Sequence, residues 1–507
     1  MHVTATLGQI VSRGAAVAAH RPWPRAVLDE ESWRAAVARI GETDWTLLGL
    51  WAEAAAVHAA LHDEAAGEIA VLSLSCPHGR FPSLAHARPS AIRLERAAAD
   101  LFGLVPDGGF DSRPWLDHGR WHVHHPLGRP VPSAAPPPAY AFLAAEGEGL
   151  HQIPVGPVHA GIIEPGHFRF HANGETVVRL EERLGYAHKG IEGLLAGSAL
   201  DRAGKIVARV SGDSTVAYSF AFAQAVEVAA GIEAPPRAQW LRALMAELER
   251  LANHFGDIGA ICNDAAFSLL HAHCAVLREA VLQESGACFG HRLMMDRIVP
   301  GGMSCDLDDA GRARLLALAG RLRGQFAELF ELYDNTASLL DRTEGTGIVS
   351  PALVRKFGAG GFVGRASGRG FDARKALRYP PYGELDFDVP VLNGGDVNAR
   401  LVIRAREVEQ SLRLVEQILN RLPAGPVRGP EPDFSAAGEG MALIEGFRGD
   451  VLLWLRLEEG RRVARCHPRD PSWFQWPLLE AAIENNIVAD FPLCNKSFNC
   501  SYSGQDL

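Results

Sequence analysis

A proline-rich segment at residues 129–139 (RPVPSAAPPPA) divides this chain of 507 residues into two parts. It contains five prolines, and its remaining side chains are mostly too small to contribute to a core. Proline-rich segments adopt extended, semi-rigid conformations that commonly connect domains. We therefore predict an N-terminal domain over residues 1–128, a linker over 129–149 and a C-terminal domain over 150–507. Each of the two domains is long enough to fold by itself.

The composition excludes several classes of protein. Fifty basic residues against 60 acidic ones give a net charge of −10, which argues against a nucleic-acid-binding protein. No apolar run reaches the length of a membrane-spanning helix, and the N-terminus lacks the pattern of a signal peptide. The eight cysteines contain no C-x-x-C pair, which is typical of free thiols in a reducing compartment. We therefore expect a cytoplasmic protein.

The residue patterns predict an α+β fold. In the N-terminal domain, apolar stretches at 33–40 and 51–61 favour helices and the run at 69–75 favours a strand, which indicates a small α+β domain. The C-terminal domain contains two expected hairpins, one around Asn173-Gly174 and one around residues 458–460.

Long helices are expected to form most of the C-terminal domain. Apolar residues recur every three or four positions from Leu241 to Ile261 and from Val408 to Leu422, where Pro423 ends the pattern, and residues 315–340 resemble a third helix. Together these patterns predict a mostly helical domain, namely a bundle of long helices with peripheral β-hairpins.

Two further segments admit alternative interpretations. The histidine-rich stretch DHGRWHVHHP, with His118, His122, His124 and His125, could bind a metal, but no carboxylate or cysteine joins it at a recognised ligand spacing. A solvated loop is the favoured interpretation. The glycine-rich segment 358–370 lacks the G-K-S/T ending of a phosphate-binding loop, so we expect it to pack closely against other parts of the chain.

Polar side chains are concentrated beside glycines in three motifs, and composition alone leaves both structural and functional roles open for them. Histidine and glutamate beside such turns can carry protons, and arginine can hold a polar ligand or pair with a carboxylate. The motifs are IPVGPVHAGIIEPGHFRF with His159, Glu164 and His167, LGYAHKGIE with Tyr186, His188, Lys189 and Glu192, and LIEGFRGD with Glu445 and Arg448.

These motifs resemble one protein family. Residues 154–196, 221–260 and 387–423 are similar to the large catalytic subunit shared by respiratory complex I and the energy-converting, membrane-bound nickel–iron hydrogenases. Residues 94–104 (LERAAADLFGL) resemble the signature of the small peripheral-arm subunit of complex I. The order of the two on one chain is similar to the large subunit of formate hydrogenlyase-type complexes.

The resemblance implies a cavity between this chain and a small iron–sulfur subunit. Hydrogenases hold nickel and iron there on four cysteines, whereas in complex I quinone enters the cavity. The cysteine positions fall here on Ser211, Ser214, Ser501 and Gly504, which cannot supply soft thiolate ligands. The resemblance therefore implies no metal held by this chain. The position of the quinone-binding tyrosine falls on Gly212.

Other residues around this centre match the family pattern. The resemblance implies catalytic roles for His159, for Glu164 at the place of a proton-gate glutamate, and for Arg448, which matches an arginine above the metal in hydrogenases. The residues expected to bind a cofactor or acceptor are His188, Lys189, Tyr218 (at the usual histidine position), Ser211 and Ser214.

The resemblance implies a subunit of a membrane-associated oxidoreductase, peripherally attached to the inner membrane. Electrons would pass from an iron–sulfur cluster on a small partner subunit to quinone or another acceptor, coupled to ion translocation by antiporter-like membrane subunits. The chain alone would bind no cofactor, with quinone as the candidate acceptor. The alternative is a non-catalytic adaptor between a soluble module and a membrane ion translocator. A nickel–iron hydrogenase with altered ligands is disfavoured.

Overall fold

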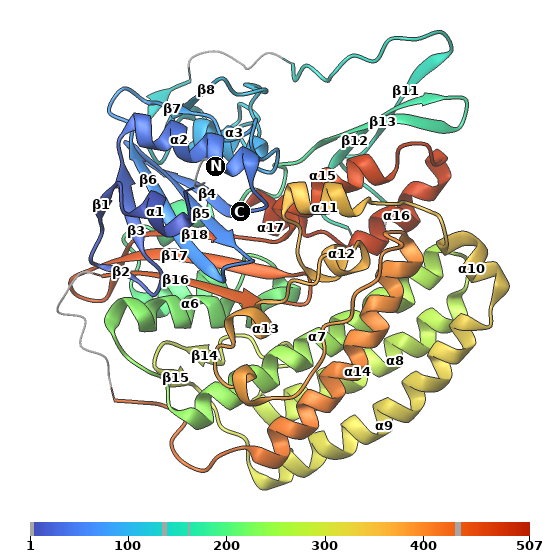
Figure 1. Ribbon diagram of the computed structural model, residues 1–507. Coiled ribbons are helices and arrows are strands. Elements are labelled where there is room, and N and C mark those ends of the chain that lie inside the picture. Colours follow the sequence, from blue (N-terminus) through green and yellow to red (C-terminus); the bar gives the residue numbers. More distant parts are fainter. Residues whose placement is uncertain (1–4, 134–138, 161–162, 431–437) are drawn as a thin grey trace.

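The computed structural model describes residues 5–133, 139–160, 163–430 and 438–507 (Figure 1). The fold is α+β, as predicted, with two main sheets on one side and a bundle of long helices on the other (Figure 1). Residues 134–138 of the predicted linker lie outside the described residues. Preceding them, β10 (Val131–Pro132) pairs with β9 (Val123–His124). The predicted domain boundaries remain predictions.

A five-stranded sheet forms the core of the N-terminal part, in the order β1-β3-β6-β5-β4. Two longer helices accompany it, α2 (Glu30–Glu42) and α3 (Ala91–Phe102), and the Asp29 side chain caps α2 by accepting from Ser32 N. The strands are β1 (Ala15–Ala16), β3 (Arg25–Leu28), β4 (Thr46–Glu53), β5 (Ala56–Asp63) and β6 (Glu68–Ser75).

The prediction of a helix at residues 51–61 is wrong. This alanine-rich stretch is the hairpin of β4 and β5, in which Glu53 pairs with Ala56 across a two-residue turn. The ring of Trp51 stacks 5.5 Å from that of His467 and lies 5.5 Å from that of Trp454. Packing on both faces of these buried strands therefore outweighs the helical propensity of alanine. The expected helix at 33–40 and strand at 69–75 are confirmed in α2 and β6.

The second main sheet combines one strand from the N-terminal part of the chain with three strands from its C-terminal part. Its order is β18-β17-β16-β2, in which β2 (His20–Arg21) pairs in parallel with β16. Arg25 and Glu439 form a buried ion pair near this junction. The predicted hairpin around residues 458–460 is confirmed, but it belongs to this buried sheet rather than to the periphery. The three C-terminal strands of the sheet are β16 (Gly438–Glu445), β17 (Asp450–Glu458) and β18 (Arg462–Arg469).

A three-stranded sheet extends outward from the molecule at the upper right of Figure 1. It consists of β11 (Leu150–Val155), β12 (His167–Asn173) and β13 (Thr176–Arg183). Asn173 pairs with Thr176, so the predicted hairpin is confirmed with its turn at Gly174 and Glu175. The loop between β11 and β12 carries His159 and Glu164.

Four long helices form the predicted bundle (Figure 1). Pro236 begins α7, a favourable place for proline because the first helical N–H needs no partner. The helix expected at 315–340 is interrupted at Asn335-Thr336 and continues as α10 (Ala337–Thr343). None of the described helices is long and apolar enough to cross a membrane. The bundle helices are α7 (Pro236–Asp264), α8 (Ser268–Phe289), α9 (Asp309–Asp334) and α14 (Val397–Arg421).

The glycine-rich segment 358–370 packs closely against other elements, as predicted. It contains α12 (Gly361–Ala366) and lies beside the turn between β16 and β17. Gly361 has a φ of +65°, and a Cβ there would lie 1.8 Å from the carbonyl oxygen of Arg448. Only glycine permits this approach, so the segment fixes the position of the turn that carries Arg448.

Shorter elements complete the described chain. They are α1 (Leu7–Val11), β7 (Arg80–Pro82), β8 (Val105–Asp107), α4 (Ile191–Leu195), α5 (Leu200–Val207), α6 (Thr215–Ala230), β14 (Ile298–Val299), β15 (Gly302–Met303), α11 (Pro351–Phe357), α13 (Ala373–Leu377), α15 (Ser472–Ala482), α16 (Phe491–Phe498) and α17 (Tyr502–Asp506).

Candidate functional site

Three segments far apart in the sequence meet at the candidate site. They are the short 3-10 turn η1 (Gly212–Ser214) before α6, the turn between β16 and β17, and residues 499–504 at the start of α17. Buried hydroxyl and carboxylate groups from these segments form one hydrogen-bonded network. We call this network, with the residues described below, the polar centre.

Two serines at positions where the sequence resemblance leads one to expect cysteines are bonded to each other. The Oγ atoms of Ser211 and Ser501 lie 2.8 Å apart, and the hydroxyl of Ser211 also lies 2.8 Å from Oδ1 of Asp213. Ser501 caps α17 by accepting from Gly504 N at 2.9 Å. The hydroxyls are therefore already engaged within the chain. Hard oxygen donors of this kind do not suit nickel or low-valent iron.

Arg448 is held over η1 by an ion pair with Asp213. Its Nη1 lies 2.7 Å from Oδ1 of Asp213 and 3.2 Å from Oγ of Ser214, and its Nε donates to the carbonyl of Asn499. Burial opposes ionisation of Asp213, but the guanidinium outweighs it and holds the pKa of that carboxyl below its ordinary value. The side chain of Asp213 is 34% exposed and that of Arg448 is 5% exposed, so solvent reaches the pair through Asp213.

Asp470 occupies the space that a side chain at position 504 would need. A Cβ on Gly504 would lie 2.5 Å from Oδ2 of Asp470 and 2.9 Å from Oγ of Ser501. That carboxylate accepts from the hydroxyl of Tyr218 at 2.6 Å and from Ser472 N at 2.9 Å. Burial, together with the adjacent Asp470, raises the pKa of Tyr218 well above its ordinary value, so the phenol remains a donor. A cysteine at position 504 does not fit this arrangement.

Two cysteines lie near the polar centre as buried thiols. Burial raises the pKa of Cys494 to about 11 and that of Cys500 well above its ordinary value. Both groups are therefore protonated at neutral pH, whereas a metal ligand would be a thiolate. The described residues contain no group of three or more histidine, cysteine or acidic side chains arranged to hold a metal ion.

The predicted residues Glu164 and His159 lie at the edge of the site. Glu164 accepts from Ser503 N at 3.0 Å, and Oγ of Ser503 lies 3.5 Å from that of Ser501. This contact places an exposed carboxylate within two residues of the polar centre. His159 bonds instead to the carbonyl of Gly166 in its own loop, at 2.7 Å. The structure thus joins Glu164 to the centre but not His159.

The predicted residues His188 and Lys189 bind backbone rather than the polar centre. The ring of His188 lies 2.7 Å from the carbonyl of Asp506, and Lys189 Nζ donates to the carbonyl of Val210 at 2.7 Å. Lys189 therefore fixes the backbone immediately before Ser211. Glu192 pairs instead with Arg465 and His467.

Two rings of the histidine-rich stretch are tied individually into the chain. Nε2 of His118 lies 2.8 Å from the carbonyl of Leu184, and Nδ1 of His124 lies 3.1 Å from Asp117. Both of these rings thus have a local partner.

A hollow of about 240 Å³ opens beside the polar centre, next to Asp213. Leu248, Leu282 and Met294 give it apolar walls, and Glu249 lies at its polar end. Glu249 accepts from Val216 N at 2.7 Å at the start of α6. Burial is the main reason why the pKa of Glu249 is raised to about 8, so this carboxyl holds a proton at neutral pH.

Sequence reasoning missed the two aspartates that organise the polar centre. Asp213 lies between Ser211 and Ser214, so its proximity to them was readable in the sequence, although its partner Arg448 was not. Asp470 follows β18 and precedes Pro471, and nothing in that local pattern indicates that it reaches Gly504 and Tyr218.

Comparisons with known proteins identify relatives of this chain. The family described as "Respiratory-chain NADH dehydrogenase, 49 Kd subunit" matches residues 265–437, and that described as "Respiratory-chain NADH dehydrogenase, 30 Kd subunit" matches residues 30–137. Carbon monoxide-induced hydrogenase of Rhodospirillum rubrum is 32% identical over 351 residues, which are 69% of this chain and 97% of that protein. A subunit of the NADH-quinone oxidoreductase of Desulfotalea psychrophila is 32% identical over 341 residues, covering 66% of this chain and 91% of that protein.

The chain therefore belongs to the family of large subunits shared by respiratory complex I and energy-converting hydrogenases, as the sequence resemblance predicted. Formate hydrogenlyase subunit 5 of Escherichia coli is 30% identical over 437 residues, covering 84% of this chain and 77% of that protein. Among solved structures, a chain of the membrane-bound sulfane sulfur reductase, an archaeal respiratory membrane complex, matches with a TM-score of 0.67 and 25% identity. It is covered completely and covers 72% of this chain.

Proposed function

We propose that this chain is the subunit of a membrane-associated, complex I-like oxidoreductase in which electrons from a partner's iron–sulfur cluster reach quinone or another small acceptor. Membrane subunits would couple this transfer to ion translocation. Family membership supports the general class, because its relatives are subunits of complex I and of hydrogenases. This proposal excludes nickel–iron hydrogenase activity.

One observation carries the choice of acceptor. Asp470, bonded to Tyr218, fills the place of the family's last cysteine side chain at position 504. The polar centre therefore offers hydroxyls, a carboxylate and a guanidinium in place of thiolates. The hydroxyls and the guanidinium can donate hydrogen bonds to the oxygens of an organic acceptor, and a carboxyl group can transfer protons to them. Reduction of a quinone requires both, since each electron added to its oxygens must be balanced by a proton.

The residues of this chain would have distinct tasks. Asp213 is the partly exposed member of the polar centre, so it would contact the acceptor first, with the buried Arg448 paired behind it. Ser211 and Ser214 lie on either side of Asp213 and would supply hydrogen bonds to the acceptor. Glu164, at the edge, would carry protons between solvent and the centre. The cofactors would be the partner's iron–sulfur cluster and the bound quinone, neither of them held by this chain alone.

The same structure also gives a reason to keep the adaptor alternative. Ser211, Ser501, Tyr218 and Arg448 are all buried and bonded within the chain. A centre whose polar groups satisfy one another can be a structural replacement for a lost metal site. In that case the chain would link a soluble module to membrane ion-translocating subunits without passing electrons.

Titration of the intact complex with a quinone analogue distinguishes the two functions. The complex is purified through this chain, its iron–sulfur cluster is reduced, and the analogue is added while the cluster's paramagnetic signal is recorded. Electron transfer predicts reoxidation of the cluster by the analogue, slowed at least tenfold in Arg448→Gln. The adaptor function predicts no reoxidation. Glu192→Gln is the matched control, because Glu192 is a buried carboxylate that pairs with Arg465 and His467 and not with residues of the polar centre.

A further inference from the structure

A second group of charged side chains is buried between the bundle and the second main sheet. We call it the ionic cluster. It contains three arginines, namely Arg250 on α7, Arg365 on α12 and Arg374 on α13, none of them more than 3% exposed. It also contains four carboxylates that are equally buried: Glu247, Asp372, Glu407 and Glu445.

Arg365 and Arg374 connect the carboxylates. Nε of Arg365 lies 2.7 Å from Glu407, and its Nη1 lies 2.9 Å from Glu445. Arg374 binds Asp372 at 2.7 Å and Glu247 at 2.8 Å. All seven groups are therefore within one continuous set of ion pairs, completed by Arg250, which lies 3.5 Å from Glu247 and 3.6 Å from Glu407.

The charges of the ionic cluster do not balance. Four carboxylates face three guanidiniums, which leaves one negative charge in excess when every acid is ionised. Neighbouring ions do not supply the missing charge. Arg404 pairs with Asp257 and Asp450 pairs with Arg469, and the buried Arg400 bonds to Ser497 and to the carbonyls of Gly347 and Gly395 rather than to any of the four carboxylates. A net charge buried away from water is costly, so one additional proton stabilises the cluster.

Two groups compete for this proton, His254 and Glu445. Nε2 of His254 lies 2.8 Å from Glu407, while its Nδ1 is buried without a partner. Burial lowers the pKa of His254, and the arginines Arg250 and Arg404 oppose its charge. Burial and the nearby Asp372 raise the pKa of Glu445 to about 7, despite the opposing charges of Arg365 and Arg250. Glu445 is therefore the group that gains and loses the proton near neutral pH.

The surroundings of Glu445 are otherwise complete. Its Oε2 accepts from Ala373 N at 2.9 Å, and its backbone N–H donates to the hydroxyl of Tyr379. Glu247 is satisfied by Arg374, by the hydroxyl of Tyr382 at 2.7 Å and by that of Ser411 at 2.7 Å. No further titratable side chain is needed to describe the balance.

Arg250 joins the ionic cluster to the polar centre. Its two terminal nitrogens donate to the carbonyls of Glu445 and Gly446, each at 3.0 Å. These carbonyls belong to the turn that presents Arg448, which pairs with Asp213. We propose that the ionic cluster stores one exchangeable proton on Glu445 and takes it up when an electron reaches the adjacent polar centre. The inference rests on the proposed electron transfer: one electron comes from the partner's cluster, one proton comes from solvent, and the buried charge remains unchanged.

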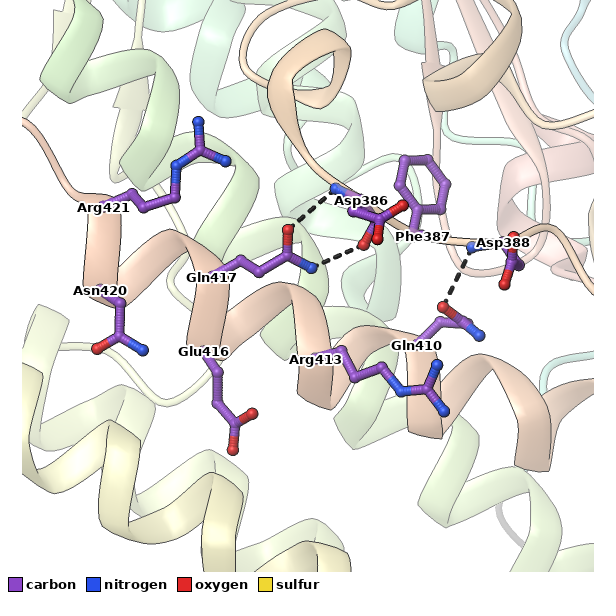
Figure 2. Close-up of a pocket in the computed structure, with 9 residues that line it drawn as sticks. All are labelled: Asp386, Phe387, Asp388, Gln410, Arg413, Glu416, Gln417, Asn420 and Arg421. Atoms are coloured by element: carbon purple, nitrogen blue, oxygen red, sulfur yellow. Dashed lines mark hydrogen bonds between the residues drawn. The ribbon is translucent and has the colours of Figure 1, made fainter.

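The ionic cluster comes near a surface groove at Arg374. Arg374 lies 5.0 Å from the ring of Phe387, which also lines a surface groove of about 440 Å³ along α14. Gln410 and Gln417 hold the backbone on either side of that ring, as the dashed lines in Figure 2 show. Phe387 therefore touches the ionic cluster through Arg374 and also borders the groove.

Infrared spectroscopy of the purified complex tests this inference. The difference between the wild-type and Glu445→Gln spectra is expected to contain the C=O band of one protonated carboxylic acid that disappears as pH rises through about 7. This band is expected to be absent in Glu445→Gln and displaced in Glu445→Asp. The matched control is Glu95→Gln. Glu95 is another buried acid, whose pKa burial also raises to about 7, but it lies on α3 and contacts Ser83 and Leu84.

Reduction of the complex above that pH is expected to restore the Glu445 band, and Phe387→Ala is expected to speed its exchange in heavy water. An unchanged band in Glu445→Gln, or its loss in His254→Asn instead, would overturn the assignment of the proton. A Glu445 band that titrates but ignores reduction would overturn the coupling and leave the proposed function standing. A complex without any reducible cluster would overturn the proposed function itself.

Discussion

Substituting Gly504 by alanine tests how tightly the polar centre is filled. The added methyl group would lie 2.5 Å from Oδ2 of Asp470 and 2.6 Å from its Cγ, well inside contact distance. Overpacking a core costs about 1–3 kcal/mol, and displacing the carboxylate also weakens its bond from Tyr218, which as a bond to a charged group contributes about 1.5–3 kcal/mol. We expect Gly504→Ala to lower the free energy of unfolding by about 2–4 kcal/mol.

A double-mutant cycle isolates the cause. Asp470→Ala removes the atoms that the methyl group would strike, so Gly504→Ala should cost about 2 kcal/mol less in that background. Gly212→Ala is the matched control, because a Cβ at Gly212 would meet nothing within 4 Å. Its expected effect is below about 0.5 kcal/mol.

Denaturant unfolding of the full chain, followed by tryptophan fluorescence, measures these differences. Trp476 reports directly on the site, because its Nε1 donates to the carbonyl of Ser501 at 3.2 Å. Equal stabilities of Gly504→Ala and Gly212→Ala would refute the reasoning. So would a cost for Gly504→Ala that does not depend on Asp470, because the methyl group would then be accommodated elsewhere.

Three further substitutions test other parts of the account. Asp213→Asn leaves the buried Arg448 without its counterion, and we expect the free energy of unfolding, measured with denaturant, to fall by about 2 kcal/mol. This value is smaller than for a fully buried ion pair because Asp213 is partly exposed. An unchanged free energy of unfolding would show that the pair contributes nothing. The pKa of Glu249 is about 8 in the folded state, above its ordinary value of 4.5. The free energy of unfolding of the wild type should therefore fall as pH rises from about 4.5 to about 8 and stay constant above that, whereas Glu249→Gln should depend less on pH. Parallel pH profiles of the two proteins would contradict the assignment. Gly361→Ala should lower the free energy of unfolding by about 3 kcal/mol or more, because its Cβ would overlap the carbonyl of Arg448 and because the residue has a positive φ. A thermal-unfolding temperature equal to that of the wild type would be inconsistent with this close approach.

Long-range periodicity made the helical bundle predictable. The apolar stripe from Leu241 to Ile261 lies inside α7, and Pro423 follows the end of α14 as expected. The hairpins were predictable because their turns carry glycine beside alternating strands. The prediction of a helix for the alanine-rich residues 51–61 was wrong, because their strand conformation depends on partners such as Trp454 and His467 that lie in a distant part of the sequence.

The candidate site was predictable in its position but not in its contents. Family resemblance located Ser211, Ser501 and Arg448, and the structure brings them together. Asp470 could not be found, because its role depends on the absence of a side chain at Gly504 and on a contact with Tyr218 across the fold. The excess charge of the ionic cluster was equally hidden, since it emerges only when α7, α12, α13, α14 and β16 are packed together.

The central claim is that a family scaffold has replaced its metal site by a network of side-chain hydrogen bonds while still serving electron transfer. The most direct test is metal analysis combined with electron paramagnetic resonance on the complex purified through this chain. The account predicts iron with a reducible cluster signal and no nickel, and reoxidation of that cluster by a quinone analogue. Stoichiometric nickel would contradict the filled polar centre, and the absence of both metals would leave the adaptor function as the better description.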